Sequence, residues 1–279
     1  MTPTVTDKFI ADAVAFFRDL QDRICASFES FEASAKFEQT EWERGPDHRL
    51  KGGGRMRVMR AQVFEKVGVN FSQVWGHISE QGMSQVQGAK ESGGKFVASG
   101  ISLVSHMSNP FVPTIHMNVR FMYTDHLWLA GGADLTPTFP FEDDTSEFHA
   151  AMKAACDRYR PGAYQEYKEW CDRYFYLPHR REPRGVGGIF FDDLHTGDLE
   201  KDFAFLRDVG EMFLEVYPKI VARRKGMSFT EADKDKQLIK RGRYAEFNLV
   251  YDRGTKFGFA TDANPDAYLM SLPPVVKWP

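Results

Sequence analysis

The segment Thr114–Arg120 constrains the fold more than any other stretch of this 279-residue chain. It follows a turn-rich stretch, Asn109–Pro113, and alternates apolar with polar residues, as a strand does when one of its faces is buried. Successive side chains of a strand point to opposite faces. We therefore expect a polar row of His116, Asn118 and Arg120 on one face. Such a row could bind and protonate an anionic ligand, or it could be the solvated side of an ordinary half-buried strand.

Periodicity in the rest of the chain predicts further strands and helices that do not alternate regularly. This mixture favours an α+β fold, with one large, mostly antiparallel sheet covered by helices in a single domain spanning residues 1–279. Pro218 is expected to end or kink its helix. Helices are predicted at 7–31, 144–159, 163–176, from 198 to about 218 and at 228–241, and strands within 35–75 and at 96–104, 113–123, 127–130 and 243–251.

Composition excludes several classes of protein. The net charge of −3 gives no indication of a nucleic-acid partner. No apolar run approaches the roughly 18 residues of a membrane-spanning helix. The three cysteines, Cys25, Cys156 and Cys171, form neither a disulfide framework nor a zinc motif. We therefore expect a cytoplasmic protein without a membrane span.

Cofactor-binding motifs are missing as well. Gly88–Lys95 resembles a phosphate-binding loop, but its lysine comes one position late and Phe96 replaces the metal-binding hydroxyl. No dinucleotide, haem-attachment, zinc-protease or serine-hydrolase motif occurs. We expect no organic cofactor, and chemistry carried by side chains, the substrate and either dioxygen or a divalent metal.

Reactive residues nevertheless concentrate at expected loops and strand ends, where functional groups tend to lie. The arginines of Pro178–Gly188 could clamp carboxylates, or they could be a solvated loop. Asp252, followed by Arg253 and a glycine, could be functional or could simply form a hairpin turn. Four histidines could hold a divalent metal, although their separations of 10, 33 and 30 residues match no metal motif; they are His106, His116, His149 and His179.

Several long motifs occur in order along the chain. They include NPFVPTIHMNVR at 109–120, GGADLTP at 131–137, WCDRYFYLPHRREPRGVGGIFFDDL at 170–194 and KRGRYAEFNLVYDRGTKFGF at 240–259. Through them the chain resembles the aerobic coproporphyrinogen III oxidases from about residue 7 to its end. The resemblance implies oxidative decarboxylation of two propionates of coproporphyrinogen III to vinyl groups, with dioxygen as acceptor. It also implies a flat antiparallel sheet sandwiched between α-helices and a homodimer formed through C-terminal segments. A tetrapyrrole-binding protein without turnover is the alternative.

The resemblance also implies roles for individual residues. His116, Asp252 and Arg253 are implied to be catalytic, with His116 handling protons and Asp252 facing the pyrrole nitrogens. His106, His116, His149 and His179 correspond to proposed metal ligands. One arginine of a family motif is replaced by Ser108, and the segment 262–264 replaces a glycine-glycine-arginine contact to a propionate. The implied substrate-binding positions are Ser102, Asn118, Val119, Arg120, Asp134, Arg180, Arg184, Asp262, Ala263 and Asn264.

Overall fold

A single antiparallel sheet organises the structure, a computed structural model that describes residues 5–84, 86–260 and 263–279. Within these ranges the main sheet has seven strands in the order β1-β2-β3-β4-β5-β6-β9, and every neighbouring pair is antiparallel. The first six strands therefore follow chain order, and β9 joins after two helices. The strands are β1 Glu38–Glu43, β2 Leu50–Met59, β3 Lys66–His77, β4 Lys95–His106, β5 Thr114–Tyr123, β6 Leu127–Thr136 and β9 Gly187–Leu194.

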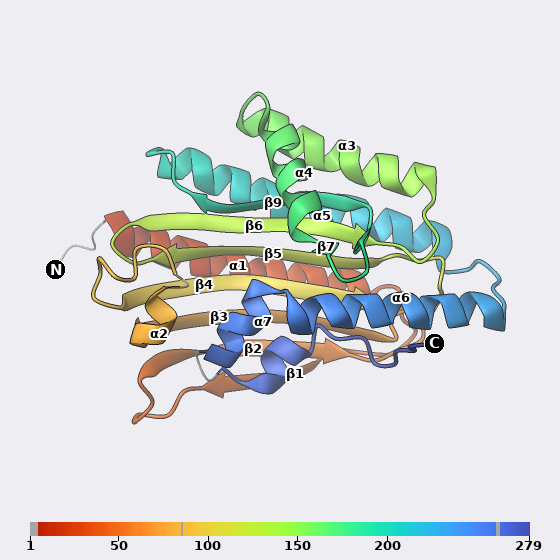
Figure 1. The fold of residues 1–279 in the computed structure, drawn as a ribbon, viewed down its shortest axis with the longest axis horizontal. Helices are drawn as coiled ribbons and strands as arrows, with labels where there is room; N and C mark the ends of the chain where they lie inside the picture. The colour runs from red at the N-terminus through yellow and green to blue at the C-terminus, as the bar shows by residue number, and fades with distance from the viewer. Residues whose placement is uncertain (1–4, 85, 261–262) are drawn as a thin grey trace.

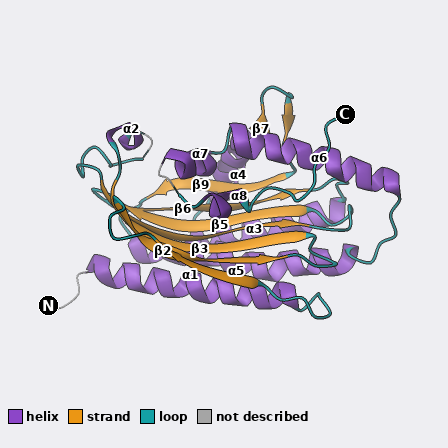
Figure 2. Ribbon diagram, turned by 90° about the horizontal axis from the view of Figure 1, so that it is seen from below, coloured by secondary structure: helices purple, strands orange, loops and turns teal. Residues whose placement is uncertain are grey.

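Helices cover both faces of this sheet. Figure 2 shows α1, α3 and α5 on one side and α6, α7 and α8 on the other. A short hairpin, β7 Tyr176–Leu177 with β8 Glu182–Pro183, precedes β9. This arrangement confirms the expected α+β class. The helices are α1 Val5–Glu29, α2 Glu80–Met83, α3 Glu142–Tyr159, α4 Ala163–Tyr174, α5 Leu199–Arg224, α6 Glu231–Val250, α7 Arg253–Ala260 and α8 Pro265–Leu269.

The main hydrophobic core lies between the sheet and the layer of α1, α3 and α5. Phe17 and Ile24 of α1 have no exposed surface, as the three- and four-residue spacing of its apolar positions predicts. Ile115, Met117 and Val119 of β5 are equally buried. Because strand side chains alternate, this burial leaves the neighbouring polar residues of β5 on the opposite face, which the C-terminal helices cover (Figure 1).

The predicted strand at 243–251 is wrong, because α6 continues through it to Val250. The segment alternates apolar and polar residues, but Arg241, Tyr244 and Asn248, which are buried in α6, also recur at helical spacing. A capping box between Thr230 and Asp233 begins the helix, two residues after the Ser228 that the sequence pattern suggested.

Two other helix boundaries also differ from expectation. Pro218 does not end α5, which continues to Arg224, because apolar residues on both sides of the proline, such as Val216 and Ile220, are buried in the core. Asp144 does not cap α3; its carboxylate instead accepts hydrogen bonds from Arg223 and Arg224 at the end of α5. None of the described helices combines the length and the apolar surface that crossing a membrane requires.

Candidate active site

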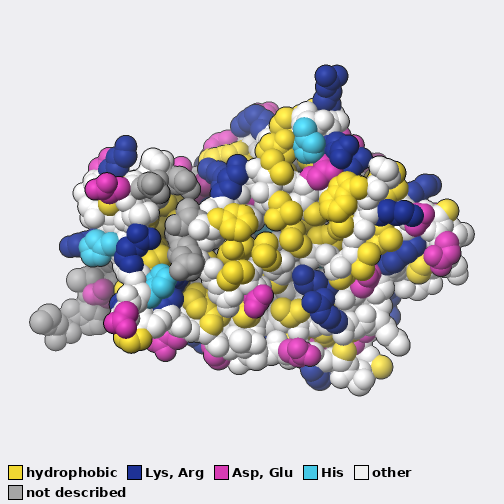
Figure 3. All heavy atoms as spheres, turned by 60° about the horizontal axis from the view of Figure 1, so that its bottom comes forward, with side chains coloured by type: hydrophobic (Ala, Val, Ile, Leu, Met, Phe, Trp, Pro, Cys, Tyr) yellow, Lys and Arg dark blue, Asp and Glu magenta, His cyan; other side chains and the backbone are white. Residues whose placement is uncertain are grey.

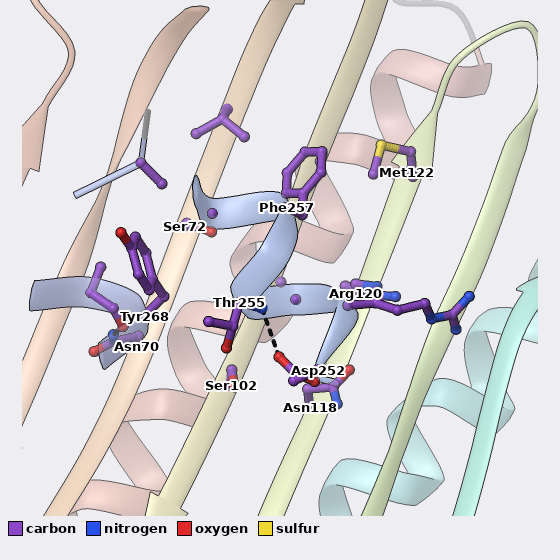
Figure 4. Close-up of a pocket in the computed structure, with 18 of the residues that line it drawn as sticks. Asn70, Ser72, Ser102, Asn118, Arg120, Met122, Asp252, Thr255, Phe257 and Tyr268 are labelled. Carbon is purple, nitrogen blue, oxygen red and sulfur yellow. Dashed lines mark hydrogen bonds between the residues drawn. The ribbon is translucent and has the colours of Figure 1, made fainter. Parts of the chain in front are cut away.

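A cavity of about 660 Å³ lies between the sheet and helices α6 to α8 (Figure 4). This volume is within the range typical of small-molecule sites. One part of the lining is apolar and includes Leu50, Phe96, Met122, Trp128 and Phe257. The rest is polar and charged, and includes Asn70, Ser102, His116, Asn118, Arg120, Arg184, Asp192, Asp193, Tyr244, Asn248, Asp252 and Arg253.

The polar floor of the cavity comes from neighbouring strands in register. Asn70 of β3 pairs with Ser102 of β4, which pairs with Asn118 of β5. Paired residues on adjacent strands present their side chains to the same face. His116 and Arg120 lie two residues to either side of Asn118 and also line the cavity, as the alternation in the sequence predicts.

His116 is oriented by a buried carboxylate. Its Nδ1 lies 2.9 Å from Oδ1 of Asp134, the residue opposite it on β6. Burial alone would raise the pKa of Asp134, but Arg184 and His116 outweigh burial, so this pKa lies below its ordinary value. An ionised Asp134 can only accept, so Nδ1 of His116 carries a proton. In the neutral ring Nε2, 3.2 Å from Nδ2 of Asn118, is then the proton-accepting atom.

Arg184 pairs with the same carboxylate, Asp134, that orients His116. One of its guanidinium nitrogens donates to both oxygens of Asp134, at 2.7 Å each, and the other donates to Asn248 at 3.0 Å. The guanidinium also lies 4.0 Å from the ring centre of Phe175. Arg184 is only 1% exposed. Its charge is therefore already balanced by Asp134, and the structure argues against Arg184 and Asp134 as free contacts for a substrate carboxylate.

Asp252 heads helix α7 and does not form the hairpin turn that was one interpretation of the sequence. Its Oδ2 accepts the backbone N–H of Thr255 at 2.6 Å, which is the hydrogen bond of an N-cap residue. Its Oδ1 accepts the hydroxyl of Tyr174 at 3.0 Å. Figure 4 shows Asp252 and Thr255 over the strands that carry Ser102 and Asn118. The carboxylate is thus fixed in orientation while it lines the cavity.

Arg120 and Arg253 also line the cavity, one from the sheet and the other from the first turn of α7. Each has a guanidinium nitrogen near Asp192 of β9, at 3.5 Å for Arg120 and 2.8 Å for Arg253. Nε of Arg120 is buried and has no hydrogen-bond partner among the described residues. These two arginines are therefore placed to receive a carboxylate from a ligand in the cavity.

Only some of the other predicted substrate contacts line the cavity. The side chain of Val119 is in the main core on the opposite face of the sheet, so it cannot reach the cavity. Arg180 is paired with Glu246 of α6, at 2.6 Å, and does not line the cavity. Ala263 and Asn264 do line it, whereas Asp262 lies outside the described residues.

The four histidines proposed as metal ligands do not come together. His106 bonds the carbonyl of Ser271, and its pKa falls to about 3 because it is buried. His149 bonds the carbonyl of Val186 and the hydroxyl of Tyr164. His179 bonds Tyr251 and Glu246, and His116 bonds Asp134. Among the described residues no three His, Cys, Asp or Glu side chains form a possible metal site. These histidines therefore do not fit a shared metal ion.

Sequence reasoning missed several residues that line the cavity. Asn70 and Ser72 alternate with buried Val69 and Phe71 on β3, so the same period-two pattern that revealed His116 could have found them. Tyr174, Asp192, Tyr244 and Asn248 could not have been found in this way, because their own helices and strands bring them to the cavity only in the folded chain.

A partly apolar cavity with arginines, an oriented histidine and a fixed carboxylate is the site of an enzyme that binds a bulky anionic molecule. The family model for coproporphyrinogen III oxidase matches residues 12–279. The chain belongs to this family.

Curated relatives match almost the whole chain. The oxygen-dependent coproporphyrinogen-III oxidase of Rickettsia bellii (strain OSU 85-389) is 51% identical over 273 residues, covering 95% of this chain and 96% of that protein. The protein of the same name from Rickettsia akari (strain Hartford) is 51% identical over 272 residues, covering 94% and 96%. That of Rickettsia africae (strain ESF-5) is 50% identical over 273 residues, covering 95% and 96%.

Proposed function

We propose that this chain is an oxygen-dependent coproporphyrinogen III oxidase acting in haem biosynthesis. Two propionate groups of coproporphyrinogen III become vinyl groups, giving protoporphyrinogen IX. For each propionic acid group, carbon dioxide and two hydrogen atoms leave, and dioxygen takes up those two electrons and two protons to give hydrogen peroxide. The observation that carries this proposal is the cavity in which His116, Asp252, Arg120 and Arg253 meet, in a chain 51% identical to enzymes of that name.

The cavity suits the chemistry of this substrate. Coproporphyrinogen is apolar at its pyrrole rings, carries four carboxylates and offers four pyrrole N–H donors. The apolar lining matches the rings, and Arg120 and Arg253 match a carboxylate. Oδ1 of Asn70 and Oδ1 of Asn118 are buried and accept no hydrogen bond from the described residues, so a pyrrole N–H would satisfy either.

His116 and Asp252 then divide the proton transfers. We assign to Asp252 the task of accepting a proton from a pyrrole nitrogen, because its carboxylate is fixed at the cavity wall. We assign to His116 the protons taken up by reduced dioxygen, because its Nε2 is the ring nitrogen left to exchange protons when Nδ1 faces Asp134. Ser102, Ala263 and Asn264 complete the contacts with the substrate. No organic cofactor takes part in this scheme.

We further propose that the whole chain, residues 1–279, is one catalytic domain that works as a cytoplasmic homodimer. Hydrophobic side chains gather on the face formed by the C-terminal part of the chain (Figure 3). Exposed apolar surface of this kind often marks a protein interface. In the C-terminal part of the chain, the large apolar residues that are between 46% and 55% exposed are Leu249, Val250, Phe259, Val275 and Trp278. Light scattering should then report about twice the chain mass of 31.9 kDa.

Turnover by the purified protein tests the proposed activity. Coproporphyrinogen III is incubated in air, without oxygen, and in air with a chelator, and the products are separated after oxidation to fluorescent porphyrins. Protoporphyrin should form in air only. Conversion that continues without oxygen, with another electron acceptor, would contradict the proposal. Tight binding without conversion would favour the tetrapyrrole-binding alternative, and loss of activity with chelator would reveal a metal requirement.

A further inference from the structure

Asp192 and Asp193 are the two aspartates of the motif IFFDDL at 189–194, and the roles assigned above use neither of them. They lie in an irregularity of β9. Phe191 is paired with Gly131 of β6, but the next pair is Leu194 with Leu129. Asp192 and Asp193 therefore lie opposite one residue of β6, Ala130, which is the geometry of a β-bulge.

The bulge decides where the aspartates point. Phe191 and Leu194 both face the main core, although a regular strand would not bury residues three apart on one face. Asp193 is the extra residue of the bulge, and its backbone has a φ of 55°, in the left-handed region. As a result neither carboxylate enters the core, and both aspartates line the cavity.

Asp192 then lies within reach of two arginines from different parts of the fold. Arg120 is paired with Ala130, the residue opposite the bulge, whose small side chain lets the arginine reach across β6. Oδ1 of Asp192 is 3.5 Å from Arg120, and Oδ2 is 2.8 Å from Arg253. One carboxylate thus joins the central sheet to the first turn of α7.

The burial of these side chains shows which of them can move. The side chain of Asp192 is 8% exposed and belongs to a strand, whereas Arg120 is 38% and Arg253 56% exposed. If both arginines turned away, a buried carboxylate would be left without a counter-charge, which is costly. Asp192 therefore holds the arginines, and an incoming anion does not displace it.

We propose that Asp192 is a positioning residue that holds Arg120 and Arg253 as a two-armed receptor for one substrate carboxylate. Two guanidinium groups and one aspartate leave a single positive charge, which matches one propionate. Each arginine bonds Asp192 through one nitrogen, so donors on both remain for the ligand. This inference rests on the proposed function, because it takes the ligand to be the tetra-anionic substrate.

For one substitution, simple electrostatics and the positioning role predict opposite changes in substrate affinity. Removing a negative charge from the cavity should, by electrostatics alone, tighten binding of an anion. Asp192→Asn should instead weaken the anaerobic binding of coproporphyrinogen III about 10-fold, the size of one lost charge-assisted hydrogen bond. Binding is followed by quenching of tryptophan fluorescence, since Trp42 and Trp128 line the cavity. In air, KM should rise with a smaller change in kcat, a split that general destabilisation would not produce.

Asp193→Asn is the matched control. It removes the same charge from the same cavity one residue away, but this carboxylate lies beside Gln87 and forms no ion pair with either arginine, and asparagine tolerates the positive φ. Because it only removes a negative charge from the cavity, it should tighten binding, the opposite of the effect expected for Asp192→Asn. In an Arg253→Ala background, Asp192→Asn should lose part of its effect, because only Arg120 is left for Asp192 to hold.

Several results would overturn the inference. Binding by Asp192→Asn that equals or exceeds that of the wild type would show that Asp192 merely competes with the substrate. Full additivity with Arg253→Ala would show that it does not act through the arginine. If Asp192→Asn does not fold, Asp192→Glu decides: it should raise KM more than Asp193→Glu does, and equal KM values would refute the role. An inactive, non-binding wild type would refute the proposed function as well.

Discussion

Replacing Asp252 by asparagine separates the two roles that the structure gives to this side chain. As the N-cap of α7 it accepts the N–H of Thr255, and as a cavity carboxylate it is the proposed acceptor of a pyrrole proton. Asparagine caps helices about as well as aspartate. The substitution therefore keeps the cap and removes only the charge and one acceptor.

The two roles predict effects of different size. Losing the bond from Tyr174 should cost about 1 kcal/mol of unfolding free energy, and losing a negative charge at a helix N-terminus a further ~0.3–1 kcal/mol. Losing a positioned base should lower kcat by about 10²–10⁴-fold, which corresponds to roughly 2.7–5.4 kcal/mol of activation free energy. The loss of rate should therefore exceed the loss of stability.

Porphyrin fluorescence after oxidation measures kcat, and urea unfolding measures stability. Tyr174→Phe is the control, because it removes the same hydrogen bond and leaves the carboxylate charged. It should match Asp252→Asn in stability to within about 1 kcal/mol and lose far less activity. A folded Asp252→Asn protein with nearly normal kcat would mean that Asp252 is only a helix cap.

Substitutions at four further residues test other parts of the structure. Arg120→Ala should weaken anaerobic substrate binding about 10- to 150-fold, and Arg120→Lys should recover only part of it; unchanged binding would exclude a carboxylate clamp. Asp134→Asn leaves a buried arginine unpaired and should cost about 3–5 kcal/mol in urea unfolding, whereas His116→Gln should lower kcat with little loss of stability. The pKa of Glu246 is lowered from 4.5 to about 2, chiefly by its hydrogen bond from Arg180, so its stabilising effect is present above pH 4.5 and lost towards pH 2. Glu246→Gln should therefore unfold more readily than wild type in urea at pH 7 but similarly at pH 2; a difference that persists at pH 2 would contradict this.

Local patterns in the sequence were sufficient to predict a strand or a helix where a single spacing of apolar residues was dominant. The alternation in Thr114–Arg120 predicted both the burial of Val119 and the shared face of His116, Asn118 and Arg120, because a strand has only two faces. The spacing of the apolar residues predicted α1 in the same way. The α+β class followed from such elements and their irregular order.

Tertiary structure decided the features that depend on partners far away in the chain. The pattern of residues 243–251 fits both a strand and a helix. The segment is helical in the folded chain, where the polar residues Arg241 and Asn248 of α6 are buried against the rest of the fold. Arg184 and Asp134 are 50 residues apart, and only folding joins them as a buried pair behind His116. Likewise, a bulge in β9 directs Asp192 to Arg120 and Arg253. The sequence alone therefore determines which groups are present and which face of a regular strand carries them. Their charges and accessibility are set by the neighbours that packing brings to them.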